Sequence, residues 1–194
     1  MEDYFANLVK ARRTTYVFTE VYVKDDLINT ILETARWTPS SHNTQPWSFI
    51  VIKNQKKIKQ LIDICEYGEY HSTPNTIIAV VLEPIYISEG GYRAGPGKKF
   101  SDYHKFLNIG LVVGNIVNQA TELGIHSCIL SPEIKKSNKI LNVTGKREAL
   151  ILVGLGYERP MAFEKKQERK ELSNLVFYEE YGLKQKPKYP ESGD

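Results

Sequence analysis

The apolar residues of the chain repeat with two different spacings, which predict helices and strands in alternation. Spacings of three and four residues predict helices at residues 3–11, 25–36, 55–66 and 102–123, and one more that opens at 131–133. Dense runs of β-branched residues predict buried strands at residues 48–53, 76–82, 126–130 and 149–153. This alternation places the chain in the α+β class, or in α/β in the loose sense.

Polar residues mark where two of these helices begin. Asp25 or Asp26 can cap the second helix. Ser131 can cap the helix that follows it, with Pro132 in the first turn. After the first helix, Phe18 anchors an extended piece of chain.

The segment 102–123 is the longest predicted element. Its apolar residues point in every direction around a helix, and such a helix is expected to be buried on all sides. Asn108 and Asn115 interrupt it, and its apolar core is too short to span a membrane. Gly110 and Gly114 lie one turn apart and would let another helix approach closely. We therefore expect this helix to be central, or to be covered on one side by a second chain.

Length and composition indicate an ordinary globular domain and exclude several kinds of function. With 194 residues, 41% of them hydrophobic and 25% charged, the chain can bury a core. Its net charge of +3 provides no broad field for nucleic acid. The N-terminus lacks the apolar run of a signal peptide, so we expect a cytoplasmic protein that has no membrane segment.

Residue spacings give no support to metal or hydrolytic chemistry. Cys65 and Cys128 stand far apart and form neither a disulfide framework nor a zinc motif. The four histidines lack metal-ligand spacing, and no G-x-S-x-G elbow is present. We therefore expect no metal site.

Two segments stand apart from the regular pattern within the single predicted domain, residues 1–194. Residues 86–99 contain four glycines and are expected to form a mobile loop or lid. Residues 164–194 are expected to form a C-terminal arm or tail, and the apolar residues within this segment suggest that it packs on another surface.

The stretch T-P-S-S-H-N-T-Q-P-W, residues 38–47, is unlike the rest of the chain. Pro39 and Pro46 lack a backbone donor and restrict the residues before them. The six polar residues between the prolines then form a stiff loop whose donors and acceptors are fixed in place. A solvated connector is the plain alternative, but two prolines and a tryptophan are unusual in a mere connector.

Arg12 and Arg13 follow the first predicted helix and have two open explanations. The pair is favourably placed at a helix C-terminus, and it is also suited to binding phosphate. A cationic pair, a rigid polar loop and an aromatic share of 11% together suit a planar, anionic, tightly held ligand.

Two motifs resemble those of the nitroreductase family of flavin enzymes. Residues 39–47, P-S-S-x-N-x-Q-P-W, resemble the family signature P-S-x-x-N-x-Q-P-W, and residues 12–18, R-R-T-T-Y-V-F, resemble its R-R-S/T-x-R/K-x-F. Weaker echoes continue to residue 178. The resemblance implies a mainly antiparallel central sheet flanked by helices, with a long buried central helix, in an intertwined homodimer.

The resemblance names FMN as the cofactor and implies which residues bind it. Two arginines and a threonine would hold the phosphate, helped by an arginine in the tail: Arg12, Arg13, Thr14 and Arg169. Other residues would border the isoalloxazine ring or lie near its central edge: Pro39, Ser40, Ser41, Asn43, Leu130 and Ser131. Gln45 would steady the loop rather than touch the flavin.

One position departs from the family pattern. Tyr16 stands where the family usually has Arg or Lys, close to flavin N1 and O2. A phenol can offer only a neutral hydrogen bond there.

The resemblance implies an FMN-dependent oxidoreductase that takes hydride from NADH or NADPH. It would reduce nitroaromatic, quinone or similar electron-poor small molecules by a ping-pong mechanism, and no side chain need act as a catalytic acid. Two alternatives remain open. The same fold and cofactor could serve enone reduction or reductive dehalogenation, and a flavin-binding protein without catalysis would carry the same motifs.

Overall fold

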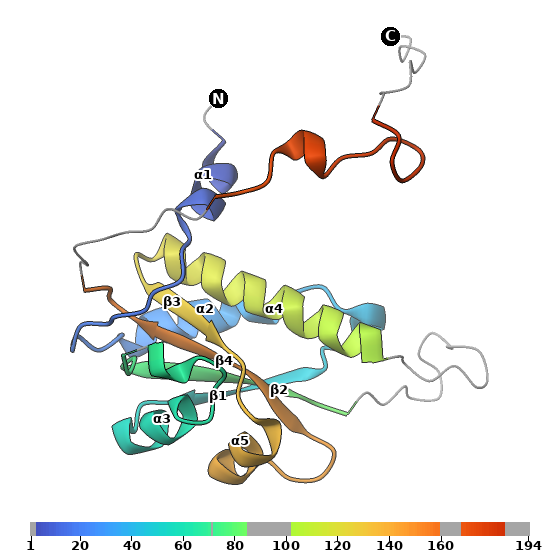
Figure 1. Cartoon of the computed structure of the whole chain (residues 1–194). Coiled ribbons are helices and arrows are strands. Elements are labelled where there is room, and N and C mark those ends of the chain that lie inside the picture. Colours follow the sequence, from blue (N-terminus) through green and yellow to red (C-terminus); the bar gives the residue numbers. More distant parts are fainter. Residues whose placement is uncertain (1–2, 71, 85–101, 160–167, 185–194) are drawn as a thin grey trace. The chain divides into compact units, whose positions relative to one another are not determined.

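The computed structural model describes residues 3–70, 72–84, 102–159 and 168–184, in two compact units (Figure 1). The first unit spans Met1–Pro160, and the second spans Met161–Asp194. The predicted loop at 86–99 lies outside the described residues.

Four strands of the described chain form one antiparallel sheet at the centre of the first unit. They are β1 (Trp47–Ile52), β2 (Thr76–Leu82), β3 (His126–Leu130) and β4 (Glu148–Gly156), in the order β1-β2-β4-β3. Every pairing between neighbours is antiparallel. The four predicted strands are confirmed.

Strand β4 continues three residues beyond the predicted end because its glycines are used for close packing. A Cβ on Gly154 would lie 2.7 Å from the Cys128 sulfur, and one on Gly156 would lie 2.7 Å from Phe18 Cδ1. Neither glycine has a positive φ. The two residues are therefore strand residues that let other groups approach, rather than turn residues.

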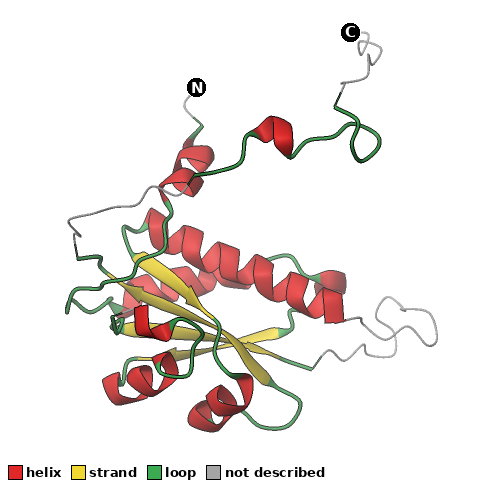
Figure 2. Cartoon of the chain, in the orientation of Figure 1, coloured by secondary structure: helices red, strands yellow, loops and turns green. Residues whose placement is uncertain are grey.

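Helices cover both faces of the sheet (Figure 2). On one face, α2 (Asp25–Arg36) and α4 (Asp102–Glu122) enclose a core that includes Ile31, Ile116 and Val153. On the other face, the shorter helices α3 (Gln55–Ile62) and α5 (Ile134–Leu141) border a second core. Because β2 is buried along its whole length, both layers are needed to cover it.

The predicted helix starts are wrong in detail. Helix α2 has Lys24 at its N-cap, so Asp25 and Asp26 lie in its first turn, where they can favour the helix dipole without capping it. Helix α5 begins after Glu133. The Ser131 carbonyl instead accepts a hydrogen bond from the Glu66 backbone at 3.0 Å, which holds this residue outside the helix.

Helix α1 (Tyr4–Ala11) lies against α4 but buries none of its own residues. Phe5 and Val9, one helical turn apart, are both exposed. Helix α3 ends at Ile62, earlier than predicted, because the chain turns there while Cys65 still reaches the core.

Within one chain, α4 is not buried on all sides. Its residues Val112 and Ile116 are fully buried, but the Phe106 side chain is 62% exposed and that of Leu111 is 41% exposed. A Cβ on Gly110 would meet no atom within 4 Å. A second chain over this open side stays a prediction.

In the second unit, the described residues 168–184 contain one short 3₁₀ helix, η3 (Leu172–Asn174). The apolar side chains of Leu172, Leu175 and Tyr181 are exposed. The prediction that this arm packs on another surface is not tested by the single chain.

Both cysteines are expected to resist thiol reagents in the folded protein. Burial raises the pKa of Cys65 and of Cys128 to about 12, so at pH 8 each thiol stays protonated and shielded. An Ellman assay at pH 8 should detect almost no thiol in native protein and both thiols after unfolding in guanidinium. Rapid labelling of the native chain would contradict this placement.

Candidate functional site

Residues 12–16 leave α1 in an extended conformation and lie beside the edge strand β3. Arg12, the C-cap of α1, has φ −62° and ψ 126°. Thr14 forms a parallel bridge with Ser127, and the Thr15 N–H donates to the Ser127 carbonyl at 2.9 Å. Phe18, buried beneath Gly156, then fixes the far end of the segment.

A carboxylate gathers the side chains on one side of this segment. The Arg13 guanidinium donates to Glu158 Oε2, and the Thr15 hydroxyl lies 3.5 Å from Glu158 Oε1. The Glu158 backbone N–H donates to His126 Nδ1 at 3.3 Å. Among the described residues, the Arg12 side chain makes no hydrogen bond or ion pair.

The polar loop between Pro39 and Pro46 has an unusual backbone. It contains the 3₁₀ turn Ser41–Asn43, and His42, Asn43 and Gln45 have φ values of 53°, 54° and 44°. Left-handed conformations cost side-chain-bearing residues roughly 1–2 kcal/mol each, and such strain gathers at functional sites.

Hydrogen bonds within the loop hold this conformation. Ser40 Oγ accepts from the Gln45 backbone N–H at 2.9 Å, and the Gln45 side chain donates to Asn43 Oδ1 at 3.2 Å. Gln45 thus steadies the loop, as predicted. Pro46 then joins the sheet, because its carbonyl accepts from the Glu83 N–H at 3.1 Å.

Two asparagines of α4 tie the loop to the core. Asn108 Oδ1 accepts from the Ser41 N–H at 3.1 Å, and the Asn115 amide donates to Thr38 Oγ1 at 2.8 Å. Asn108 is 1% exposed, and its Nδ2 has no partner among the described residues. The two residues that interrupt the apolar pattern of α4 are therefore the anchors of the loop.

The end of α2 fixes the entry to the loop. The Glu33 carboxylate accepts hydrogen bonds from Arg36 and, at 3.1 Å, from Trp37 Nε1, while the Arg36 guanidinium lies 5.0 Å from the Trp37 ring centre. The bonds from Arg36 and then Trp37 lower the pKa of Glu33 to about 2. Glu33 is therefore ionised at neutral pH, when these contacts orient the last turn.

The two motif segments lie at opposite corners of the sheet. The loop enters Trp47 at the start of edge strand β1, and residues 12–16 meet Ser127 near the start of the other edge strand, β3. Because all neighbours are antiparallel, these points differ by about 20 Å along the strands and about 14 Å across three strand spacings. One compact site within one chain cannot include both.

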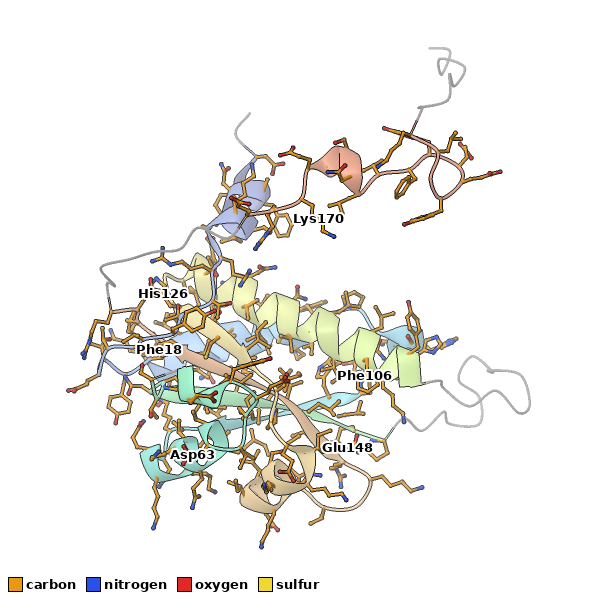
Figure 3. All side chains as sticks on the ribbon, in the orientation of Figure 1. Phe18, Asp63, Phe106, His126, Glu148 and Lys170 are labelled. Carbon is orange, nitrogen blue, oxygen red and sulfur yellow. The ribbon has the colours of Figure 1, made fainter. Side chains whose placement is uncertain are left out.

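Helix α4 gives the same separation independently. The loop is bonded to Asn108 near its start, whereas α1 meets its end, where the Glu122 carboxylate accepts a hydrogen bond from Tyr4 and raises the pKa of that phenol. Fourteen helical residues span about 21 Å. Figure 3 shows the same two ends: His126, the first residue of β3, lies at the left of the view, and Phe106, near the start of α4, lies at the right.

The remaining predicted site residues are distributed between these places. Leu130 is buried and Ser131 exposed, at the end of the strand that bridges Thr14. Tyr16 is 41% exposed. Arg169 belongs to the second unit, so its part in any shared site stays a prediction.

Sequence reasoning did not identify Glu158 or His126 as neighbours of residues 12–16, which belong to the first motif along the chain. Neither belongs to a recognisable pattern, and their position depends on a bridge across the end of the sheet between Phe18 and Glu158. Asn108 did carry a signal, since an amide in an apolar helix needs a partner.

The described part of the chain holds neither a metal-binding cluster nor a membrane-spanning helix. No group of three or more His, Cys, Asp or Glu in it could hold a metal ion. None of its helices has the length and apolar character to cross a membrane.

Comparisons with known proteins connect this geometry to one family. The nitroreductase family profile matches residues 9–68. A protein named iodotyrosine deiodinase, from Hydra vulgaris, is 23% identical over 197 residues, which cover 90% of this chain and 72% of that protein. An iodotyrosine deiodinase from Daphnia pulex is 21% identical, over 90% of this chain and 65% of that protein.

Solved structures show the same fold. A nitroreductase family protein from Streptococcus pneumoniae TIGR4 has a TM-score of 0.73 at 24% identity, over 89% of this chain and 98% of that one. An FMN-dependent nitroreductase from Clostridium difficile R20291 has a TM-score of 0.72 at 19% identity, over 91% and 99%. The predicted nitroreductase-like α+β fold is confirmed.

Replacing the loop anchor should destabilise the protein. Asn108→Ala leaves the Ser41 N–H without its acceptor in a buried setting, which is worth about 1–3 kcal/mol. Urea unfolding at fixed protein concentration measures it. Asn115→Ala is the matched control and should lower the free energy of unfolding by less. In this variant the Thr38 hydroxyl no longer accepts a hydrogen bond from Asn115, but it can still donate one. Equal losses would contradict the anchoring role of Asn108.

Proposed function

We propose that this chain is a member of the nitroreductase family, which its fold and its N-terminal motif region support, and that it is an FMN-dependent oxidoreductase. It takes electrons from NADH or NADPH and passes them to a nitroaromatic, quinone or similar electron-poor small molecule by a ping-pong mechanism. The cytoplasm is the proposed location.

The observation that carries the proposal is the state of the first motif. Arg12 presents a guanidinium with no partner among the described residues, on a segment fixed to β3 by Thr14 and Thr15. A fork of N–H donors beside a hydroxyl suits a phosphate group. The residues of this segment therefore fit the phosphate end of FMN. The family resemblance adds Arg169, and we propose it as a further cation.

The polar loop fits the ring end of the cofactor. Its strained backbone is over-determined by hydrogen bonds, so it can present fixed donors and acceptors to a planar ligand. We assign the ring contacts to Pro39, Ser40, Ser41 and Asn43, together with Leu130 and Ser131 near the central edge of the ring. FMN, when bound, supplies the redox chemistry, and the protein binds and orients it.

Tyr16 distinguishes this site from the family pattern. It is partly exposed, on the same segment as Arg12, in the place that the family gives to a cation near the ring. Its phenol can donate one neutral hydrogen bond but no positive charge. The site should therefore stabilise negative charge on that side of the ring less strongly than a site with Arg or Lys at this position would.

The separation of the two motifs supports a homodimer with shared sites. One chain holds them at opposite corners of its sheet, so a second copy must supply one of them if both are to meet the same FMN. The exposed side of α4, with Phe106, Leu111 and the open Gly110, offers an apolar surface for that copy.

Reductive dehalogenation is a second candidate activity. The observation that favours it is the match to iodotyrosine deiodinase from Hydra vulgaris, which extends over 90% of this chain. The same cofactor would serve, and only the electron acceptor would differ.

The purified protein should be yellow and should bleach when NADH or NADPH is added under anaerobic conditions. Recovery of the flavin absorbance on addition of a quinone, a nitroaromatic or an iodophenol then identifies the acceptor class. Protein that cannot be reconstituted with FMN would reject the proposal, and flavin that never bleaches would leave a non-catalytic flavin protein. FMN release by acid and mass spectrometry provides the control for the cofactor.

Mixed dimers should reveal whether each site uses two chains. Arg12→Ala and Asn43→Ala homodimers should each bind FMN weakly, by about one to two decades for the arginine. In their heterodimer, one site carries both defects and the other carries neither, so refolding the two together should restore tight binding at half the sites of each heterodimer. If mixing restores nothing, both residues serve one site from the same chain. Mixing either variant with itself is the control.

A further inference from the structure

We infer that Glu158 is a positioning residue for the phosphate-binding segment: it holds Arg13 and Thr15, and so presents Arg12 and Thr14 to the phosphate. Arg13 is then an anchor rather than a phosphate ligand, which revises the role implied by the resemblance. The inference rests on the proposed function, because it concerns how that same site is built.

The extended backbone of the segment separates its side chains into two sets. Side chains of an extended chain alternate between opposite sides, so Arg12 and Thr14 share one side and Arg13 and Thr15 share the other. The contacts of Glu158 agree with this alternation. Its two carboxylate oxygens face Arg13 and Thr15, one oxygen for each residue.

Glu158 itself is held more firmly than a surface carboxylate. Its side chain is 15% exposed, whereas that of Arg13 is 48% exposed. Its backbone N–H donates to His126, and it forms an antiparallel bridge with Phe18. Backbone bonds on both sides of it, from Thr19 to Tyr157 at 2.7 Å and from Arg159 to Val17 at 2.9 Å, fix it against the motif segment.

Electrostatics explains why the Glu158 carboxylate gives Arg12 and Arg13 different roles. Where Glu158 is paired with Arg13, that guanidinium is largely neutralised, and a phosphate placed against the same pair would also meet a negative carboxylate. No carboxylate of the described residues pairs with Arg12. Arg12 is therefore the better phosphate ligand, and Thr14 supplies a hydroxyl on the same side.

Titrations with FMN and with riboflavin, which lacks the phosphate, test this role. In Glu158→Gln the segment loses its charged anchor, so FMN affinity should fall about three- to tenfold while riboflavin affinity changes less than twofold. Arg13→Gln should give the same pattern, and the double variant should be no worse than either single variant, because both remove one interaction. Arg12→Gln should lose more FMN affinity than any of these.

Three results would overturn the inference. A rise in FMN affinity in Glu158→Gln would mean that Glu158 competes with the phosphate for Arg13. Unchanged FMN affinity would remove Glu158 from the site. An equal loss for both flavins, not restored in Glu158→Asp, would show a general structural role. Failure of the unaltered protein to bind either flavin would instead reject the proposed function.

Glu83→Gln provides the matched control. Glu83 has the same arrangement at the other end of the sheet, with one oxygen 2.6 Å from Arg147 Nε and the other 2.6 Å from the Ser48 hydroxyl. The Glu83→Gln variant should have the same ratio of FMN affinity to riboflavin affinity as the unaltered protein. Circular dichroism and thermal unfolding confirm that each variant is folded, and Thr15→Val, which removes the second contact of Glu158, replaces Glu158→Gln if that variant does not fold.

Discussion

The packing of α4 across the sheet is the constraint on which the other features depend. Its buried side, which includes Val112 and Ile116, closes one core with α2 and the central strands. The same helix carries Asn108, which holds the polar loop, and at its other end it supports α1, from which residues 12–16 emerge. One rigid helix thus sets the distance between the two motifs and leaves an apolar side open.

The strands and most helices could be predicted because their apolar spacing reflects which faces are buried. Helix ends could not, since the cap of α2 and the start of α5 depend on tertiary bonds such as that between Ser131 and Glu66. The motifs could be located from their residues. The surroundings of Arg13 could not, because Glu158 stands 145 positions away and reaches it only through the fold.

Under the proposed function, the opposite placement of the two motifs gives the single chain two incomplete half-sites rather than one weak site. Each half is held in place by contacts within the chain, the loop by its own hydrogen bonds and by α4, and residues 12–16 by Ser127 and Glu158. Neither half therefore needs a ligand to hold its shape. A ligand that binds between two such preformed halves orders few residues, so little conformational entropy is lost. The main free-energy cost is then that of bringing the two chains together.

The bridges that hold residues 12–19 also determine when this segment can take its place during synthesis. Ser72, 54 positions after Phe18, is one of its partners, but Ser127, Tyr157 and Glu158 all lie more than a hundred positions later in the chain. A ribosome makes the motif early, but the strands that receive it come almost last. Contacts of such long sequence separation form slowly because a large loop must close first. The emerging chain therefore has to complete β4 before residues 12–19 acquire all of their bonds.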